Sequence, residues 1–296
     1  MSDLMNTREV AAYLRIKERK VYDLVAARLI PCTRATGKWL FPKPLIDLWI
    51  IRNTEFHAEV ETAPAPPQVV AGSHDPLLEW AIRESGCGLA LFFDGSLTGL
   101  ERLVSRQALV SGLHVFEPKT ANYNVDLVKQ TLPGSAVVAL EWAWRQQGLI
   151  VAGGNPLGIA ELSDLCAPKV RFIDRQSGAG SHLLLEHLLA THKLSLTDIA
   201  INLPPARNET EVAQAVFSGK ADAGFGIAAV ARQFQLDFVP LHRERYDLVI
   251  GRRDYFEPTF QELLTFARSP RFAEQAAELQ GYDISGLGRI VYNAPN

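Results

Sequence analysis

Apolar positions follow two different patterns along the chain, and the first covers residues 1–52. Apolar residues at helical spacing predict a helix capped by Thr7, a three-residue turn, and a second helix over Glu18–Arg28. The stretch Thr33–Phe41 predicts two short strands around a turn at Thr36-Gly37, and a last short helix follows. This segment is therefore expected to be small and mostly helical.

The second pattern runs from about residue 74 to the end of the chain. Strand-like apolar runs such as Leu89–Phe93 alternate with helical segments such as Gly180–His192. The polar stretch Arg145–Gly148 predicts a break between two strands, and Arg243–Arg245 reads as a solvated turn. Strands that alternate with helices predict an α/β fold with mostly parallel sheets.

A proline-rich segment separates the two patterns. Glu59–Pro67 holds three prolines and no hydrophobic period, which predicts an exposed, semi-stiff linker. We place the linker at residues 53–73. The segment before it, residues 1–52, is called the head, and the segment after it, residues 74–296, is called the body.

Charge is distributed unevenly between head and body. The chain has 30 Lys and Arg against 33 Asp and Glu, a net charge of −3. Ten of those basic and five of those acidic residues fall in the head, so its net charge is +5 and that of the remainder is −8. A basic head suggests a polyanionic partner, with chance clustering of charges as the alternative.

Composition narrows the cellular setting and the chemistry. The three cysteines, Cys32, Cys87 and Cys166, are widely spaced, which disfavours a disulfide framework or a zinc site and suits a reducing compartment. The sequence has no apolar signal segment at its start and no apolar run near the ~20 residues that span a bilayer. We expect a cytoplasmic protein that has no cofactor, no bound metal and no membrane partner.

The order of elements in the head is that of a winged helix-turn-helix. In this arrangement the second helix enters the major groove of double-stranded DNA and the hairpin reaches the neighbouring backbone. Basic and aromatic side chains occupy these two elements, where they can contact phosphates and base edges. The predicted DNA-binding residues are Lys17, Arg19, Lys20, Tyr22, Arg34 and Lys38.

Two motifs of the head resemble the excisionase and MerR-type winged-helix family. Its opening pattern T-x-E-x-A-x-x-L is matched by Thr7, Glu9, Ala11 and Leu14. Its wing pattern, a glycine followed closely by a phenylalanine, is matched by the segment Gly37–Phe41. The resemblance implies DNA binding through the second helix and the wing.

In the body, the segment Asp174–Ser181 (DRQSGAGS) carries the clearest binding signal. It follows a strand and opens a helix, so unpaired backbone N–H groups and the helix dipole favour an anion there. Similar turns occur at Ser96 and Thr98 and at Asn208–Thr210, where ordinary helix capping is the alternative. His114 ends a strand, and a structural role for it is equally compatible with the sequence.

The body resembles the periplasmic-binding-protein-like sensor domain of molybdate-type regulators. The residues that carry the resemblance include Asp94-Gly95-Ser96, Tyr123-Asn124, Gln147–Pro156, Arg175–Gly180 and Ala221–Ile227. It implies a two-lobed, type II fold with a ligand between the lobes, held by hydroxyls and backbone amides. The expected ligand-binding residues are Ser96, Thr98, His114, Tyr123, Arg175, Ser177, Gly178, Ala179, Gly180, Ser181, Asn208 and Glu209.

The identity of the ligand stays open at this point. The resemblance implies an oxyanion such as molybdate or tungstate. However, the family often has Thr-Arg after Gly-Ala-Gly, where this chain has Ser181-His182. The lost arginine favours a neutral or singly charged ligand, such as a small organic metabolite.

The fold class predicted is thus an N-terminal winged helix-turn-helix joined to a two-lobed α/β domain, and the predicted function is that of a ligand-responsive transcriptional regulator. Winged helices commonly bind paired half-sites, so a homodimer is expected. A DNA-architectural accessory protein is an alternative, although such a role needs only the head. An enzyme is disfavoured because the sequence has no recognisable catalytic motif.

Overall fold

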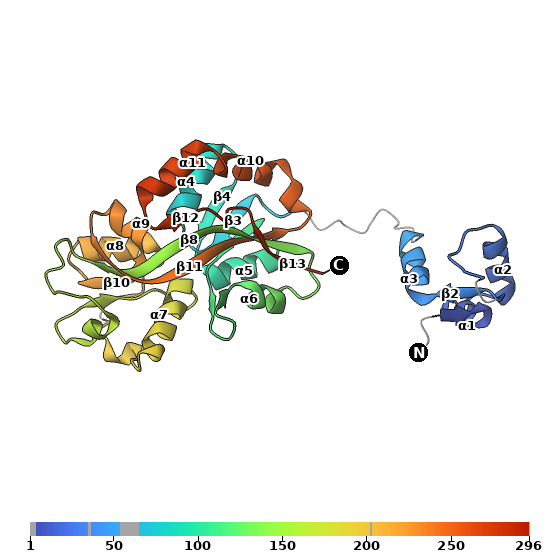
Figure 1. The fold of residues 1–296 in the computed structure, drawn as a ribbon, viewed down its shortest axis with the longest axis horizontal. Coiled ribbons are helices and arrows are strands. Elements are labelled where there is room, and N and C mark those ends of the chain that lie inside the picture. Colours follow the sequence, from blue (N-terminus) through green and yellow to red (C-terminus); the bar gives the residue numbers. More distant parts are fainter. Residues whose placement is uncertain (1–3, 35–36, 54–64, 202, 296) are drawn as a thin grey trace. The chain divides into compact units, whose positions relative to one another are not determined.

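The computed structural model describes residues 4–34, 37–53, 65–201 and 203–295. The chain divides into two compact units, Met1–Pro64 and Ala65–Asn296, which contain the head and the body (Figure 1). None of the described helices is long and apolar enough to cross a membrane.

The head holds three helices and two short strands among its described residues. In chain order these are β1 (Leu4–Asn6), α1 (Thr7–Tyr13), α2 (Glu18–Ala26), β2 (Leu40–Pro42) and α3 (Lys43–Arg52). The N-cap of α1 is Asn6 rather than the predicted Thr7. The Asn6 side chain accepts hydrogen bonds from the backbone of Arg8 and Glu9, and the Glu9 carboxylate accepts one from Asn6 N at 2.8 Å.

The strands of the head pair differently from the predicted hairpin. Strand β2 pairs antiparallel with β1 at the start of the chain. Across the wing, Thr33 and Leu40 exchange two backbone hydrogen bonds, of 2.8 and 2.9 Å. The predicted turn at Thr36-Gly37 lies partly outside the described residues. The core beneath these elements is apolar and includes Val10, Val21, Phe41 and Ile46.

The body is an α/β domain. Its strands are β3 (Val69–Gly72), β4 (Ala90–Phe93), β5 (Val110–Leu113), β6 (Phe116–Glu117), β7 (Asn122–Tyr123), β8 (Val137–Val151), β9 (Phe172–Ile173), β10 (Ala223–Ile227), β11 (Asp237–Gly251), β12 (Tyr282–Asp283) and β13 (Ile290–Asn293). Its helices are α4 (Pro76–Ser85), α5 (Ser96–Val104), α6 (Val125–Thr131), α7 (Gly180–Thr191), α8 (Glu209–Phe217), α9 (Ala228–Gln233), α10 (Pro258–Ala267) and α11 (Pro270–Leu279). Three short 3₁₀ turns are also described, at Leu162–Cys166, Leu196–Asp198 and Asp254–Phe256.

Two long strands connect the two lobes of the body. Among the described residues, a nine-stranded sheet has the order β4-β3-β5-β11-β8-β10-β9, and β12 and β13 also pair with β8. Strand β11 pairs antiparallel with β8 along its whole length, and the end of β11 pairs with β5. The first lobe is therefore built around β3, β4 and β5, and the second lobe around β9 and β10.

Helices cover both faces of this sheet. In Figure 1, α4, α10 and α11 lie on one side of β8 and β11, and α5 and α6 on the other; α8 and α9 lie opposite α7 in the second lobe. One buried apolar cluster runs from α4 and α10 across β8 to α8 and α9. A separate apolar cluster lies beneath α7 in the second lobe.

Two sequence predictions for the long strands β8 and β11 are wrong. The predicted break at Arg145–Gly148 is absent, because β8 continues from Val137 to Val151. The predicted solvated turn at Arg243–Arg245 instead lies inside β11. Both errors have the same cause. Arg243 is exposed, but Arg145, Glu244 and Arg245 are buried and paired with opposite charges, so their polarity does not indicate exposure to water.

The structure also corrects the end of the predicted linker. Residues 69–72, assigned to the linker, form β3, which pairs in parallel with both β4 and β5. The backbone conformation of Gly72 has a φ of +115°, and a Cβ there would lie 2.2 Å from the Gly112 carbonyl oxygen. Only a glycine allows β3 to approach β5 so closely at this point. The body therefore begins before residue 74.

Candidate functional site

The predicted DNA-binding side chains of the head lie on its surface. Helix α2 buries Val21 against the core, while Lys17, Arg19, Lys20 and Tyr22 are exposed. Lys17 is the N-cap of α2, so this basic group lies at the start of the helix. An exposed basic helix start is the arrangement by which recognition helices contact DNA.

The wing contributes two further exposed basic residues, Arg34 and Lys38. The guanidinium carbon of Arg34 lies 5.3 Å from the centre of the half-buried Trp39 ring. The Trp39 ring therefore supports the stem of Arg34 and leaves its charge accessible to solvent.

In the body, the starts of three helices converge on His114. The Ser96 side chain at the start of α5 accepts a hydrogen bond from His114 N at 3.4 Å. Before α7, Gly178 accepts a weak hydrogen bond from Leu97 N at 3.5 Å. A Cβ on Gly180 would lie only 2.8–2.9 Å from the His114 ring. The beginnings of α5 and α7, on opposite lobes, are thus in direct contact.

The third helix start is that of α4. Ser73 lies just before Asp75, the N-cap of this helix. The hydroxyl oxygen of Ser73 and Nε2 of His114 are 2.7 Å apart, and Nδ1 of His114 is 2.7 Å from the Glu244 carboxylate. All three side chains are fully buried. Backbone hydrogen bonds fix Ser73 as well, because its N–H donates to Gly112 O and its carbonyl accepts from the Tyr246 hydroxyl.

Glu244 belongs to a larger buried ionic network. Arg145 donates hydrogen bonds to Glu244 and, at 3.0 Å, to Asp75. Gln147 donates to Glu244 at 3.0 Å, and the Tyr282 hydroxyl donates to Asp75 at 2.7 Å. Burial is the largest single influence and by itself would raise the pKa of Glu244, but the Arg145 charge and the hydrogen-bonded His114 and Gln147 together outweigh it, and the pKa falls to about 2. These contacts join β8, through Arg145, and β11, through Glu244, to Asp75 at the N-cap of α4.

The turn before α7 presents both backbone and hydroxyl groups. Ser177 is exposed, Gly178 is half-buried, and Ala179, Gly180 and Ser181 are buried. Within the described residues, the Ser181 hydroxyl has no hydrogen-bond partner. A buried hydroxyl without a partner is costly, so it marks a position where a ligand could bind.

The remaining predicted ligand residues lie outside this convergence. Arg175 is buried and donates to the Glu209 carboxylate at 2.7 Å, so its charge is already matched. Asn208 caps α8 through the backbone N–H of Glu211. The Tyr123 hydroxyl is hydrogen-bonded to Nε2 of His242, a residue of β11, at 2.7 Å.

Thr98 is half-buried on the first turn of α5, close in sequence to Ser96. His182, which stands where the family often has arginine, pairs instead with Asp174 at 2.9 Å. This hydrogen bond raises the pKa of His182. The His182 side chain is therefore hydrogen-bonded within the second lobe.

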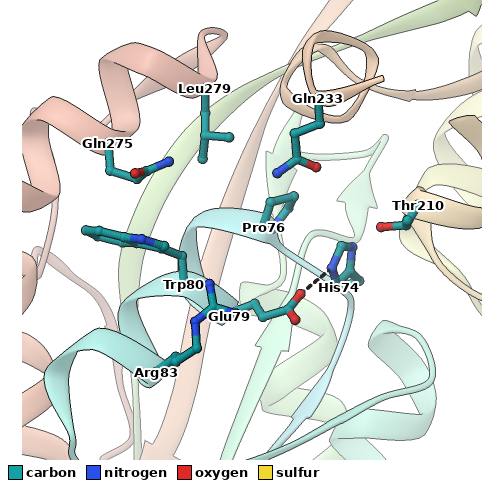
Figure 2. Close-up of a pocket in the computed structure, with 9 residues that line it drawn as sticks. All are labelled: His74, Pro76, Glu79, Trp80, Arg83, Thr210, Gln233, Gln275 and Leu279. Carbon is teal, nitrogen blue, oxygen red and sulfur yellow. Dashed lines mark hydrogen bonds and ion pairs between the residues drawn. The ribbon is translucent and has the colours of Figure 1, made fainter. Parts of the chain in front are cut away.

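A cavity of about 230 Å³ opens beside His74, between α4 and α11 on one side and the start of α8 and the end of α9 on the other. Figure 2 shows that its lining is mostly polar. The residues that line it are His74, Pro76, Glu79, Trp80, Arg83, Thr210, Gln233, Gln275 and Leu279. Nε2 of His74 donates to the Glu79 carboxylate at 2.9 Å, whereas the buried Nδ1 of His74 has no partner among the described residues.

Sequence reasoning missed Ser73, Arg145 and Glu244. A local signal did exist for Ser73, because Asp75-Pro76 marks a helix start directly after an apolar strand. No local signal exists for Arg145 and Glu244, which are 99 positions apart in the chain.

Comparison with known proteins gives a relative that covers nearly the whole chain and a second that covers about a quarter of it. It is 27% identical to the Bacillus subtilis (strain 168) protein named "Uncharacterized protein YvgK", over 96% of both chains. It is also 40% identical over 81 residues to the Clostridium pasteurianum "Uncharacterized protein in ferredoxin 2Fe-2S gene 5'region". That match covers 27% of this chain and 72% of the relative.

Solved structures with the same fold include two substrate-binding proteins. One is a putative phosphate ABC transporter substrate-binding protein with bound phosphate from Clostridium perfringens, with a TM-score of 0.53 and 9% identity, covering 71% of this chain and 96% of that one. The other is the sulfate-binding protein SubI from Mycobacterium tuberculosis H37Rv, with a TM-score of 0.53 and 16% identity, covering 72% and 85%. At these identities the likeness concerns the fold alone.

Two family descriptions match the chain. A helix-turn-helix domain matches residues 4–54, and a PBP superfamily domain matches residues 79–268, which is more than half of the chain. The predicted fold class is thereby confirmed, and the chain belongs to the PBP superfamily, with an N-terminal helix-turn-helix domain.

Proposed function

We propose that this protein is a ligand-responsive transcriptional regulator, in which the head binds double-stranded DNA and the body closes on a small oxyanion. The observation that carries the proposal is the convergence of the starts of α4, α5 and α7 on His114, with α7 contributed by the opposite lobe. Helix starts that meet between two hinged lobes form a polar site only in the closed state, so ligand binding favours closure.

Several features support an oxyanion such as molybdate or tungstate. Hydroxyls of Ser73, Ser96 and Ser181 are buried at or near these helix starts, and the glycines before α7 allow the backbone to approach closely. The nearby arginines Arg145 and Arg175 are both held by carboxylates. The ligand charge must then be met by hydroxyls and backbone N–H groups rather than by a free arginine.

Closure of the lobes can couple ligand binding in the body to DNA binding by the head. Strands β8 and β11 join the lobes, so a change in lobe angle is transmitted along both strands at once. We propose that the protein acts as a homodimer in the cytoplasm and that closure changes the spacing of two heads on paired half-sites. In this scheme the protein is not an enzyme.

The cavity lined by His74 supports a second candidate ligand, a small organic metabolite. Its volume of about 230 Å³ exceeds the space that a tetrahedral oxyanion needs, and it is lined by both acidic and basic side chains, Glu79 and Arg83. The unpartnered Nδ1 of His74 gives such a molecule a hydrogen-bonding group.

Thermal unfolding with added ligands tests the proposal. Molybdate, tungstate, sulfate, phosphate and a metabolite panel are compared on the full chain. A bound ligand at about 100 times its Kd adds roughly 2.7 kcal/mol to the stability of the body. An oxyanion shift supports the first candidate, and a shift with metabolites alone replaces it by the second. If no ligand shifts the transition, the sensor function is wrong.

A pair of serine variants on α5 locates the binding site. Ser96→Ala removes a hydroxyl at the start of the helix, whereas Ser105→Ala changes an exposed serine at its end. The oxyanion shift should shrink in the first variant and persist in the second. Equal shifts in both variants would place the ligand elsewhere.

A further inference from the structure

We propose that the cavity beside His74 is a binding site for a free α-amino acid with an uncharged side chain, held by its ammonium and carboxylate groups. The inference rests on the proposed sensor function and names the class of small metabolite that the body recognises. It follows from two opposite charges that line the cavity without pairing with each other, and from a buried ring nitrogen that has no partner among the described residues.

Glu79 and Arg83 lie on one face of α4, because residues four apart in a helix are neighbours on its surface. This spacing allows a glutamate and an arginine to form an ion pair. Among the ion pairs of the described residues there is none between these two, and the Glu79 carboxylate instead accepts a hydrogen bond from His74 at 2.9 Å. A carboxylate and a guanidinium thus lie side by side at the wall of the cavity.

Both of these charges are accessible to a ligand. The hydrogen bond from His74 lowers the pKa of Glu79, so the carboxylate is ionised near neutral pH, and its side chain is 45% exposed. The Arg83 side chain is 66% exposed, and its contact with Glu84 is long, at 3.9 Å, whereas Arg271 holds the same carboxylate more closely. One anion and one cation at neighbouring points match the ammonium and carboxylate of an α-amino acid, which a single carbon atom separates.

His74 gives an independent reason to expect a ligand in this cavity. The residue lines the cavity, and its side chain is only 9% exposed. Its Nδ1 is buried and has no hydrogen-bond partner within the described part of the chain. Because a buried polar atom without a partner is costly, a ligand that brings a polar group to Nδ1 is favoured.

The rest of the lining selects the side chain of the ligand. The charges of Glu79 and Arg83 cancel, so a zwitterion fits, whereas a charged side chain would have no partner of opposite charge. The volume of about 230 Å³ equals that of roughly eight water molecules, which suits an amino acid of small or medium size. Apolar contacts and side-chain amides are supplied by Pro76, Trp80, Leu279, Gln233 and Gln275.

Both lobes line the cavity, which links its occupancy to closure. Thr210 lies in the first turn of α8 and Gln233 ends α9, both in the second lobe, and Figure 2 shows them across the cavity from Arg83 on α4. None of the described residues that line the cavity belongs to α5 or α7. A ligand there therefore favours closure without occupying the place where α5 meets α7, so it can bind together with an oxyanion.

Isothermal titration calorimetry on the full chain tests the inference, with the twenty common L-amino acids as probes. We expect binding of amino acids with uncharged side chains, and weaker or no binding of lysine, arginine, aspartate and glutamate. For the tightest binder, the analogue without the amino group and the analogue without the carboxyl group are then titrated. Each analogue should bind at least about tenfold more weakly, because it loses one charged group and its hydrogen bonds.

Matched variants assign the two ends of the ligand. In Glu79→Gln, the amino acid and its analogue without the amino group should bind equally well. In Arg83→Gln, the same should hold for the amino acid and its analogue without the carboxyl group. A purely structural role would weaken all ligands alike and leave these ratios unchanged. The controls Glu278→Gln on α11 and Arg232→Gln on α9 change exposed charges next to lining residues and should keep the wild-type ratios.

The outcomes separate this inference from the sensor function. Full affinity for either analogue, or wild-type ratios in both Glu79→Gln and Arg83→Gln, would overturn the amino-acid site. The inference also fails if no amino acid binds while an oxyanion or another metabolite does, and the sensor function then stands. If no ligand of any class binds, the inference and the sensor function fail together.

Discussion

Head and body use charge in opposite ways. The basic side chains at the start of α2 and on the wing of the head are exposed. An ion pair described in the head, Lys43–Asp47, lies away from them on α3 and is also exposed. In the body, Arg145 is only 1% exposed and lies between two fully buried carboxylates, those of Asp75 and Glu244.

The difference teaches which charges act in binding and which act in folding. Exposed cations lose little when they leave water partly for a phosphate, and they add affinity without shaping the fold. A buried ion pair adds little net stability, but each partner depends on the other because an unpaired buried charge is costly. Variants of the exposed cations in the head should therefore change DNA binding, and variants of the buried ion pairs of Arg145 should change stability.

The largest effect is expected from Arg145→Met. This change leaves Asp75 and Glu244 buried without their cation, and it should destabilise the body by about 3–5 kcal/mol. Urea unfolding measures the loss. Arg171→Gln is the control, because Arg171 and Asp222 form an ion pair at the surface, and it should have little effect. Similar losses in both variants would contradict the distinction between buried and exposed charges.

Gly180→Ala should have the next largest effect. The new Cβ would lie 2.8–2.9 Å from the His114 ring and so oppose closure of the lobes. Crowding of this kind costs about 1–3 kcal/mol, which corresponds to roughly 5–150-fold weaker anion binding in calorimetry. Gly153→Ala serves as the control, because its nearest neighbour would be 3.7 Å away. Unchanged affinity in Gly180→Ala would mean that α7 does not approach His114 on binding.

In the head, replacing Lys17, Arg19 and Lys20 together by Ala should weaken DNA binding and leave folding intact. For every phosphate that the variant no longer neutralises, the slope of log affinity against log salt concentration should become shallower by about 0.9. Fluorescence anisotropy over a salt series measures the slope. Arg8→Ala changes an exposed arginine on α1 as a control. An unchanged slope in the triple variant would remove these residues from the interface.

His182→Gln should have the smallest effect, because this pair is only partly buried. The hydrogen bond with Asp174 raises the pKa of His182 above its ordinary value of about 6.5. The stability that it contributes is complete below that ordinary value and is lost as the pH rises through the raised pKa. The variant should therefore be less stable than wild type near pH 6 and should approach it near pH 9. A deficit that is the same at both values would contradict the assigned pairing.

Much of the fold can be predicted from periodicity. The helix predicted at Gly180–His192, for example, is α7 in the structure, with bounds Gly180–Thr191. The long strand β8, in contrast, is wrongly divided at Arg145 by its sequence pattern. The polarity of Arg145 suggests a loop, and its partner Glu244 cannot be identified from spacing in the chain.

The candidate site is predictable only in part. The turns at Ser96 and Gly180 are predictable as binding turns because hydroxyl and glycine residues there follow a strand and open a helix. The place of His114 beside them is implied only by the resemblance to the sensor domains. Ser73 falls into the predicted linker because the proline-rich composition just before it extends that linker too far. The burial of Arg175 by Glu209 depends on tertiary contacts, and no local pattern indicates it.

Anomalous X-ray scattering from a crystal of the full chain grown with molybdate tests the central claim most directly. The account predicts a molybdenum peak between the lobes, within hydrogen-bonding distance of the Ser73 hydroxyl and of the turn Gly178–Ser181. A peak in the cavity lined by His74 and Arg83 or on the surface, or no peak at a saturating concentration, would contradict it.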